Sequence, residues 1–287
     1  MTKLDKILIT GSSGRIGSYL VKLLKNHSLM LVDKKTDYDL SKEPMNGLLD
    51  FEPEIIFHLA ASFERTEETP QFLQTNYYDN MLASLRLNQA IAKMKELKKV
   101  VFASSYLVYE PDLYMVESPQ FAYLIPEKSE TNPRNLCGSA KLYEESELNF
   151  IKRNIHKNLQ LCHARIFRVY GENGQEFVSR CAQWKKDGIP VTLWKLENCF
   201  DYIHAQDVAE ALYHLAFSDC DGVYNVGSGE SHSIQEVVDL IGCKTRIIPA
   251  PDGELYENSC ADITKITKTG WYPKIDFKTG IAMVLAQ

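Results

Sequence analysis

The sequence contains 287 residues, of which 45% are hydrophobic and 24% are charged, and its formal net charge is -6. This composition is typical of a globular protein and excludes a disordered or fibrous chain. With acidic residues in excess, the sequence has no basic stripe that could bind the phosphate backbone of a nucleic acid, so we expect no nucleic-acid partner. No apolar run approaches the roughly 18 residues of a membrane-spanning helix, so we also expect no membrane partner.

The seven cysteines are scattered along the chain, and they form neither a Cys-x-x-Cys pair nor a Cys/His cluster at zinc spacing. Such a pattern predicts reduced thiols and no metal site. The first residues lead into a strand-like segment without the apolar stretch and cleavage site of a signal peptide. We therefore expect a cytoplasmic protein.

The chain begins with a βαβ pattern. Apolar strand-like runs are expected at 6–10 and 29–32, with apolar residues at helical spacing between them. The alternation continues with strand-like and helical segments at 54–60, 70–97, 100–103, 136–154 and 159–164. Alternation of this kind predicts an α/β fold with a Rossmann-type, doubly wound parallel sheet and helices on both of its faces.

The pattern loosens after Tyr170 into glycine-rich turns and short strands. A nucleotide-binding domain is predicted over residues 1–169, and 199–221 is expected to return to it. A smaller, discontinuous C-terminal α/β domain of 170–198 and 222–287 is expected to bind the substrate. Ligands of such folds bind at the carboxyl ends of the strands, so we expect the ligand site in the crevice between the domains.

A glycine-rich segment, Thr10 to Gly17, follows the first expected strand and precedes the first expected helix. Glycines there let the backbone turn sharply, let a pyrophosphate approach and let the helix pack close to the strand. The helix N-terminus adds N–H donors for an anion. A purely structural loop is the alternative, but the position between strand and helix favours dinucleotide binding. The predicted cofactor-binding residues of this segment are Gly11, Ser13, Gly14, Arg15, Ile16 and Gly17.

Asp33 follows the second expected strand. A carboxylate at this place can accept both ribose hydroxyls and would repel a 2′-phosphate, which favours NAD over NADP. Arg15, Lys34 and Lys35 lie nearby in the sequence and could tolerate a phosphate, so NADP stays the second choice. A solvated turn residue is the alternative role for Asp33.

Taken in order, the motifs resemble those of the extended short-chain dehydrogenase/reductase family, in particular its NAD-dependent nucleotide-sugar epimerase/dehydratase branch. The resemblance extends over nearly the whole chain and implies bound NAD, a nucleotide-sugar substrate and a homodimer formed through the helical stretches 77–96 and 138–154. It implies further cofactor contacts from Leu59, Ala60, Ala61, Asn76 at the start of its helix, and Ser104. The motifs lie at 10–17, 58–61, 104–109, 165–171, 201–209, 224–229 and 270–274.

Enzymes of this family oxidise a sugar hydroxyl with a serine or threonine and with the tyrosine and lysine of a Y-x-x-x-K helix. The resemblance implies that Ser105 is the hydroxyl partner and that Lys141 binds the nicotinamide ribose. Cys137 stands where the family has its tyrosine. A thiol has a pKa near 8.5, so beside a cationic lysine we expect it to ionise easily. Because its sulfur lies closer to the backbone than a tyrosine oxygen, a water, a closer substrate or another residue would relay the proton.

Three explanations of Cys137 stay open. The enzyme uses the cysteine or a replacement acid, the protein has lost chemistry and kept binding, or the chain is an engineered variant. Tyr106 and Tyr109 follow Ser105 closely and are possible substitutes for the missing tyrosine, although Tyr109 is equally expected to pack in the core.

The absence of certain carboxylates from the sequence limits the reactions that the protein could catalyse. Family dehydratases carry an Asp-Glu pair just after the active-site hydroxyl residue, whereas Ser105 is followed here by Tyr106 and Leu107. The resemblance therefore favours a 4-epimerase that acts through a transient 4-keto sugar. The alternatives are an NAD(P)-dependent dehydrogenase or ketoreductase of a sugar or sugar nucleotide, and a catalytically degenerate NAD- or sugar-binding protein.

The substrate end also departs from the family. Arg168 replaces an asparagine, and Phe200 replaces an arginine of the type that meets the diphosphate. Arg168, Arg180 or Arg246 could supply that charge by another route, or the substrate carries no diphosphate. Surface roles are the alternative for Arg180 and Arg246. The predicted substrate-binding residues are Ser105, Tyr106, Arg168 and Arg180.

Overall fold

The computed structural model of the protein describes residues 4–63, 68–118, 123–172 and 174–286. The chain divides into two compact units. Unit 1 consists of 1–108, 131–165 and 209–224, and unit 2 consists of 109–130, 166–208 and 225–287.

Short boundary shifts place 166–169 in unit 2 and 222–224 in unit 1, and the division differs from the predicted domains at two longer places. Residues 109–130, predicted within the first domain, belong to unit 2, because the strands β5 (Met115–Val116) and β6 (Tyr123–Ile125) pair with β14 (Tyr256–Ala261). Residues 199–208, expected to return to the first domain, also belong to unit 2, because β10 (Cys199–His204) pairs with β8 (Arg168–Tyr170) and with β14. Both places depend on strand partners that are distant in sequence.

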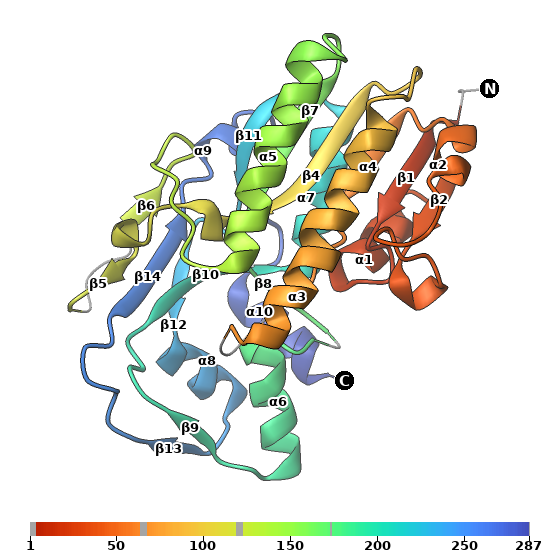
Figure 1. Ribbon diagram of the computed structural model, residues 1–287. Coiled ribbons are helices and arrows are strands. Elements are labelled where there is room, and N and C mark those ends of the chain that lie inside the picture. The colour runs from red at the N-terminus through yellow and green to blue at the C-terminus, as the bar shows by residue number, and fades with distance from the viewer. Residues whose placement is uncertain (1–3, 64–67, 119–122, 173, 287) are drawn as a thin grey trace. The chain divides into compact units, whose positions relative to one another are not determined.

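A six-stranded sheet in the order β11-β7-β4-β3-β1-β2 forms the centre of unit 1. The pairs from β2 through β1 and β3 to β4 are parallel, and Figure 1 shows helices on both sides of the sheet. The predicted Rossmann-type α/β fold is confirmed. Its strands are β1 (Lys6–Thr10), β2 (Ser28–Val32), β3 (Ile55–His58), β4 (Lys99–Ser105), β7 (Gln160–Ile166) and β11 (Gly222–Val226).

The helices of this unit carry apolar residues on the face that packs on the sheet. In Figure 1, α4 and α5 lie over one face, and α7 lies over the other. The helix predicted over 136–154 has the observed bounds of α5. The helices are α1 (Arg15–Leu23), α2 (Asn46–Phe51), α3 (Pro70–Asn76), α4 (Ala83–Ile91), α5 (Leu136–Asn154) and α7 (Ala205–Phe217), whose residues before 209 belong to unit 2. Short 3₁₀ turns lie at Lys34–Thr36 and Tyr106–Val108, and a further one at Pro111–Leu113 belongs to unit 2.

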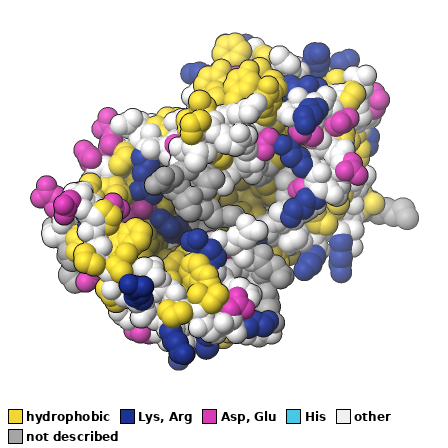
Figure 2. Space-filling model, turned by 60° about the horizontal axis from the view of Figure 1, so that its bottom comes forward, with side chains coloured by type: hydrophobic (Ala, Val, Ile, Leu, Met, Phe, Trp, Pro, Cys, Tyr) yellow, Lys and Arg dark blue, Asp and Glu magenta, His cyan; other side chains and the backbone are white. Residues whose placement is uncertain are grey.

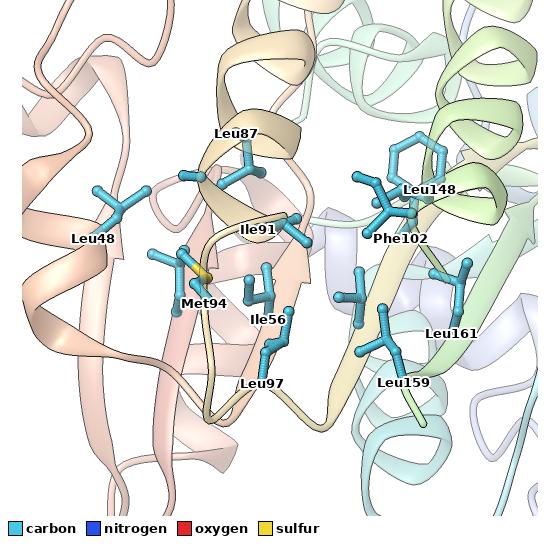
Figure 3. Close-up of a cluster of buried hydrophobic side chains, with 14 of the residues drawn as sticks. Leu48, Ile56, Leu87, Ile91, Met94, Leu97, Phe102, Leu148, Leu159 and Leu161 are labelled. Carbon is cyan, nitrogen blue, oxygen red and sulfur yellow. The ribbon is translucent and has the colours of Figure 1, made fainter. Parts of the chain in front are cut away.

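One hydrophobic core of unit 1 lies between the sheet and the helices α4 and α5. Figure 3 shows Ile56 and Phe102 from the strands facing Leu87, Ile91 and Leu148 from the helices. All five are almost fully buried. Truncating a leucine in such a core to alanine costs about 2–5 kcal/mol, so this packing holds the helices in place on the sheet.

The helical stretch predicted over 70–97 is interrupted. After α3 ends at Asn76, the chain forms a π-helix over Tyr77–Leu82 before α4 begins. The buried Asn80 of this π-helix bonds to both the backbone N–H and the carbonyl of Ser62, at 2.7 and 2.8 Å. Because these partners lie on another segment, local sequence periodicity does not reveal the break. Asn76, expected at the start of its helix, is therefore the last residue of α3.

Unit 2 is a smaller α/β unit. One sheet has the order β12-β10-β14-β5, with β6 also on β14 and β8 on β10, and a second sheet pairs β13 with β9. Its core includes Tyr202 stacked on Phe277, with ring centroids 5.3 Å apart. The strands are β5 (Met115–Val116), β6 (Tyr123–Ile125), β8 (Arg168–Tyr170), β9 (Val191–Leu193), β10 (Cys199–His204), β12 (Ser231–Ser233), β13 (Thr245–Ile247) and β14 (Tyr256–Ala261), and the helices are α6 (Phe177–Asp187), α8 (Ile234–Ile241), α9 (Thr264–Thr267) and α10 (Phe277–Leu285).

Across the described ranges, no helix combines the length and apolar character needed to cross a membrane. Acidic and basic side chains are intermingled on the face that Figure 2 shows.

Candidate cofactor and catalytic site

The glycine-rich loop between β1 and α1 is too crowded for side chains. Gly11 has a φ of 71°, and a Cβ on it would lie 2.8 Å from the backbone nitrogen of Ala60. A Cβ on Gly17 would lie 2.3 Å from the carbonyl oxygen of Gly11. Both contacts are shorter than real Cβ atoms make, so glycine is required at these positions. The loop thus packs directly against the end of β3.

The N-terminus of α1 can receive an anion. Its N-cap is Gly14, and within the described residues no side chain caps the first turn. The early N–H groups of a helix have no partner inside the helix and carry the positive end of its dipole. Arg15 and Ile16 open the helix at this point. A glycine-rich loop before such a helix end fits the pyrophosphate of a dinucleotide.

Asp33 connects the first two loops at the carboxyl ends of β1 and β2. Its Oδ2 accepts a hydrogen bond from the N–H of Ser13 at 3.0 Å, and its Oδ1 accepts one from the N–H of Lys35 at 2.9 Å. Each carboxylate oxygen can accept a second hydrogen bond, which leaves capacity for ribose hydroxyls. The ammonium group of Lys34 pairs with Asp79 and with Asp39, the latter at 3.6 Å.

The predicted residues after β3 lie beside this loop. The N–H groups of Leu59 and Ala60 both donate to Oγ1 of Thr10, at 3.2 Å, and Ala61 follows them in the chain. Asn76 is buried, and its Oδ1 accepts a hydrogen bond from Nδ2 of Asn80 at 2.7 Å. The first three residues therefore lie where a dinucleotide would cross the end of β3, while the side chain of Asn76 is used inside the helical segment.

The start of α5 contacts the turn that follows Ser105. A Cβ on Gly138 would lie 2.4 Å from the carbonyl oxygen of Leu107, so only a glycine lets the helix approach this closely. Asn135 caps the helix by accepting a hydrogen bond from the N–H of Gly138 at 2.8 Å. This contact places Cys137, in the first turn of α5, beside the turn that begins at Tyr106.

The side chains of Ser104 and Ser105 form hydrogen bonds with different neighbours. Ser104 is buried, and its hydroxyl donates to Oε1 of Glu145 at 2.6 Å. Ser105 is half-buried at the end of β4, and its Oγ accepts a hydrogen bond from the N–H of Leu107 at 3.2 Å. The oxygen of Ser105 can still donate its proton to a substrate oxygen. Tyr106 is buried beside it.

The thiol of Cys137 is buried, and the sequence-based expectation that it ionises easily is wrong. Burial raises the pKa of Cys137 above its usual value. The charge of Lys141 opposes this rise, and Glu68 adds to it. Removing the thiolate from water outweighs the attraction of the lysine, so Cys137 is a neutral thiol at neutral pH.

Lys141 lies one turn after Cys137 on α5 and is also buried. Its ammonium nitrogen is 4.6 Å from the centroid of the Phe102 ring. Burial lowers the pKa of Lys141, while Cys137, Glu144 and Glu145 act in the opposite direction. The aromatic face and the neighbouring groups favour the cation, whereas burial, the larger effect, disfavours it.

Sequence reasoning missed three buried polar residues around this lysine: Glu144, Glu145 and His58. Arg165 donates to Glu145 from Nε at 3.0 Å and from Nη2 at 2.8 Å. The ring of His58 bonds to Thr10 Oγ1 at 2.7 Å through Nδ1. Burial lowers the pKa of His58 to about 3, so the ring is neutral. The spacing of both glutamates, three and four residues after Lys141, was the available signal, because such residues share a helix face.

In unit 2, the two positions that depart from the family pattern contact each other. The guanidinium carbon of Arg168 lies 3.6 Å from the centroid of the Phe200 ring, and Nη2 is 3.3 Å from Oε2 of Glu257. Arg180 lies on α6, where its guanidinium carbon is 5.4 Å from the Trp184 ring centroid. Arg168 therefore has both an aromatic and an acidic neighbour, as arginines that bind anions through a planar face often do.

Potential metal ligands do not gather in this structure: the described ranges contain no group of three or more His, Cys, Asp or Glu side chains that could hold an ion. The features that remain are a parallel α/β sheet, a glycine cradle before a helix, an acidic residue after the second strand and a Ser-Cys-Lys set on β4 and α5. They define the dinucleotide-dependent enzymes of the Rossmann class.

Comparison of the chain with models of protein families shows the family to which it belongs. The model of the NAD dependent epimerase/dehydratase family matches residues 7–227, and the chain belongs to this family. The resemblance inferred from the motifs is confirmed, and the protein is an enzyme of this family.

Relatives cover almost the whole chain. The chain is 27% identical to a UDP-glucose 4-epimerase of Mycolicibacterium smegmatis, with 96% of each chain covered. It is 25% identical to an ADP-L-glycero-D-manno-heptose-6-epimerase of Brachyspira hyodysenteriae, covering 96% of this chain and 95% of the relative. Among solved structures, the UDP-glucose 4-epimerase of Thermus thermophilus in complex with NAD matches with a TM-score of 0.83, 25% identity and 98% of each chain covered.

Proposed function

We propose that this enzyme binds NAD and a nucleotide sugar and epimerises the sugar at C4 through a transient 4-keto intermediate. The observation that supports the proposal is the contact between the first turn of α5, where Cys137 lies one turn before Lys141, and the turn that directly follows Ser105. The relatives, which include epimerases of UDP-glucose and of an ADP-heptose, support the reaction class.

NAD rather than NADP is supported by two features of unit 1. The Asp33 carboxylate lies at the ribose position expected for this fold and would repel a 2′-phosphate. Lys34, one of the three nearby cations with Arg15 and Lys35, is paired with Asp79 and Asp39, so its charge is already balanced. The N–H groups of the glycine loop and of the first turn of α1 would hold the pyrophosphate.

The chain's own groups divide the catalytic work. NAD, when bound, supplies the hydride acceptor and donor. The Ser105 hydroxyl would hydrogen-bond the reacting sugar oxygen, and Lys141 would hold the nicotinamide ribose and offset negative charge on that oxygen. Cys137, a neutral thiol, would act as a weak donor to the same oxygen and is a poorer base than the tyrosine of the family. An Asp-Glu pair for dehydration does not follow Ser105.

Substrate contacts in unit 2 are proposed for Arg168 and Arg180. Arg168 is favoured, because its stacking on Phe200 fixes the guanidinium plane and Glu257 keeps it oriented. A fixed guanidinium can bind an anionic group of the substrate with two hydrogen bonds. The relatives differ in nucleotide and in sugar, so the proposal extends only to a nucleotide sugar.

A catalytically degenerate NAD- or sugar-binding protein is the second candidate. It is favoured by one observation, the buried Cys137 thiol with its raised pKa in place of a tyrosine. A dehydrogenase or ketoreductase, the third candidate, would produce or consume NADH in net amounts.

The experiment is a turnover assay with a panel of UDP-, GDP- and ADP-sugars, followed by chromatography of the sugars and by NADH absorbance. We expect interconversion of a C4 epimer pair without net change in NADH. The variants Cys137→Tyr and Cys137→Ala are compared with the natural chain. A gain in Cys137→Tyr would identify the cysteine as a lesion, and a loss in both variants would place the thiol in the mechanism. If no form turns over any sugar while NAD still binds, the degenerate candidate replaces our proposal.

We also infer a homodimer formed through α4 and α5, as the family resemblance implies. A shallow groove between these helices is lined by Leu85, Asn88, Gln89, Ala92, Glu147, Phe150 and Ile151. Leu85 and Phe150 are exposed apolar side chains in it, with 40% and 56% of their surface accessible. A second copy of the same two helices would cover this surface with a symmetric contact.

A further inference from the structure

The π-helix between α3 and α4 places two consecutive side chains, those of Asp79 and Asn80, against the loop that follows β3. Both side chains form hydrogen bonds with Ser62 of that loop. A single turn of π-helix within an α-helical segment is rare and often marks a functional site. The two polar residues are therefore candidates for a role in the function of the protein.

Asn80 fixes the backbone of Ser62. Its Oδ1 accepts a hydrogen bond from the N–H of Ser62 at 2.7 Å, and its Nδ2 donates to the carbonyl oxygen of the same residue at 2.8 Å. Nδ2 also donates to Oδ1 of Asn76 at 2.7 Å, which holds the amide group in this orientation. Asn80 is buried. The loop after β3 is thus attached to the helical segment through both backbone polar groups of one residue.

Asp79 joins this loop to the loop after β2. Its Oδ2 accepts a hydrogen bond from the hydroxyl of Ser62 at 2.6 Å, and its Oδ1 accepts one from the ammonium group of Lys34. Lys34 directly follows Asp33, and its ammonium nitrogen also lies 3.6 Å from Oδ2 of Asp39. Half of the Lys34 side chain is exposed but only 16% of the Asp79 side chain is, so water screens this pair only in part. One carboxylate therefore links two loops that are separated in sequence by α2 and β3.

The two linked loops lie on either side of the glycine-rich loop. The strands before them, β2 and β3, both pair in parallel with β1, so the three loops follow the carboxyl ends of adjacent strands. On one side, the N–H of Ser13 donates to Oδ2 of Asp33 at 3.0 Å. On the other side, a Cβ on Gly11 would lie 2.8 Å from the backbone nitrogen of Ala60, so these loops are in direct contact. Asp79 closes the circuit by linking the two outer loops to each other.

We propose that Asp79 and Asn80 are positioning residues for the adenosine half of NAD, which hold the loops after β2 and β3 in the arrangement that binds it. In a Rossmann-type fold, the pyrophosphate lies on the glycine-rich loop and the acidic residue after the second strand binds the ribose hydroxyls. Loops that are linked before the ligand arrives lose less freedom when it binds. Asp79 acts through Lys34 on the neighbouring Asp33, and Asn80 acts through Ser62. The proposal rests on the proposed function, in which NAD binds to unit 1.

The test is calorimetry with NAD and with ADP-ribose, which contains the adenosine half of NAD and lacks the nicotinamide. Asp79→Ala and Asn80→Ala should each weaken the binding of both ligands by the same factor, about 5- to 10-fold, because each removes hydrogen bonds that fix a loop. Asp79→Glu keeps the charge and both acceptor oxygens, so it should recover most of the affinity. An effect on NAD that is absent with ADP-ribose would contradict the proposal.

Asp221 provides a matched control in the same unit. Its Oδ1 accepts a hydrogen bond from the N–H of Leu161 at 2.8 Å, and its carboxylate pairs with Lys152, so it also joins a lysine to another segment. It directly precedes β11, at the opposite edge of the sheet from β2. Asp221→Ala should lower the free energy of unfolding in urea, as Asp79→Ala does, and should leave the affinity for ADP-ribose unchanged. An equal loss of affinity in both variants would show that the links only stabilise the fold.

A double-mutant cycle tests the route through Asp33. If Asp79 acts by placing Asp33, Asp79→Ala should weaken ADP-ribose binding much less in the Asp33→Ala background than in the natural chain. Losses that simply multiply in the double variant would contradict this route and overturn the role of Asp79.

The variants also separate failure of the proposal from failure of the proposed function. Unchanged affinity for ADP-ribose in both Asp79→Ala and Asn80→Ala overturns the proposal. Failure of the natural protein to bind either NAD or ADP-ribose would instead refute the proposed function. Because Asn80 is buried and its truncation can unfold the chain, Ser62→Ala is a second test that removes only the hydroxyl bond to Asp79. It should also weaken ADP-ribose binding, and unchanged affinity in this variant and in Asp79→Ala would contradict the proposal.

Discussion

The ammonium nitrogen of Lys141 lies 4.6 Å from the centre of the Phe102 ring, at the point where α5 crosses β4. This cation–π contact stabilises the charged lysine in a buried place by about 0.5–2 kcal/mol. Phe102→Leu removes the ring and should lower the pKa of Lys141 further. We expect the pH dependence of NAD affinity to move toward acid by about 0.4–1.5 pH units. Phe57→Leu, a buried phenylalanine on the neighbouring strand, controls for lost packing, and an equal shift in both variants would contradict the explanation.

Gly138 and Gly47 form a matched pair for testing the contact between α5 and the turn after Ser105. A Cβ on Gly138 would be 2.4 Å from the Leu107 carbonyl oxygen, whereas on Gly47 the nearest atom would be Cε of Met30 at 3.7 Å. Gly138→Ala should destabilise the protein by about 1–3 kcal/mol in urea unfolding. It should also reduce turnover by roughly 100-fold, since small displacements of catalytic groups are costly. Gly47→Ala should be neutral or stabilise by up to about 1 kcal/mol. Equal effects of the two changes would show that the close approach is unimportant.

Asp33 and Asp79 should have opposite effects on cofactor choice. Asp33→Ala removes the acceptor for the ribose hydroxyls and should raise the dissociation constant of NAD about 10- to 100-fold, equivalent to roughly 1.5–3 kcal/mol. Asp79→Asn removes one of the two acidic partners of Lys34, leaving Asp39, and should improve NADP affinity by up to roughly tenfold, as one charge-assisted contact can. Fluorescence titration with NADH and NADPH measures both. Asp50→Asn, on the exposed side of α2, serves as the control and should change neither affinity.

Glu144 also predicts a pH dependence of stability. Its pKa is raised from 4.5 to about 7 in the folded protein. Between these values the folded state holds a proton that the unfolded state has lost, so this residue's contribution to stability falls as the pH rises through the window. The advantage of Glu144→Gln over the natural chain should therefore grow by up to about 3 kcal/mol between about pH 5 and pH 8.

Urea unfolding of both proteins at several pH values checks this difference. His58 and His163 are buried and neutral in both, so their own acid-dependent losses cancel when the two curves are subtracted. A difference that does not change with pH would show that Glu144 titrates normally.

The dimer is tested on its apolar groove. Phe150→Glu places a charge on the exposed face of α5 and should convert a dimer to a monomer in light scattering, because a buried uncompensated charge opposes association. Ile189→Glu alters an apolar residue of similar exposure that lies on unit 2, and it should leave the mass unchanged. A natural chain that is already monomeric at micromolar concentration would contradict the inference.

Sequence patterns predicted those structural features that depend only on residues close to one another in the chain. The bounds of α5 follow from helical spacing and from Asn135 as its cap, and the glycine loop follows from backbone geometry alone. The π-helix could not be foreseen, because Asn80 is held by Ser62 from another segment. The raised pKa of Cys137 and the burial of Glu144 depend on how closely β3, β4 and α4 pack around α5. Spacing shows which residues share a helix face, but not how much water reaches it.

The segment 109–130 leaves unit 1 directly after the turn that follows Ser105, contributes β5 and β6 to unit 2, and returns shortly before Cys137. Ser105 and Cys137, which we propose for catalysis, are therefore joined along the chain by a segment that belongs to the other unit. Because each unit consists of several separate chain segments, a single truncation of the chain cannot produce either unit. A truncation before Tyr256 would remove β14, leave β5 and β6 with no strand to pair with, and release a loose loop between the serine and the cysteine.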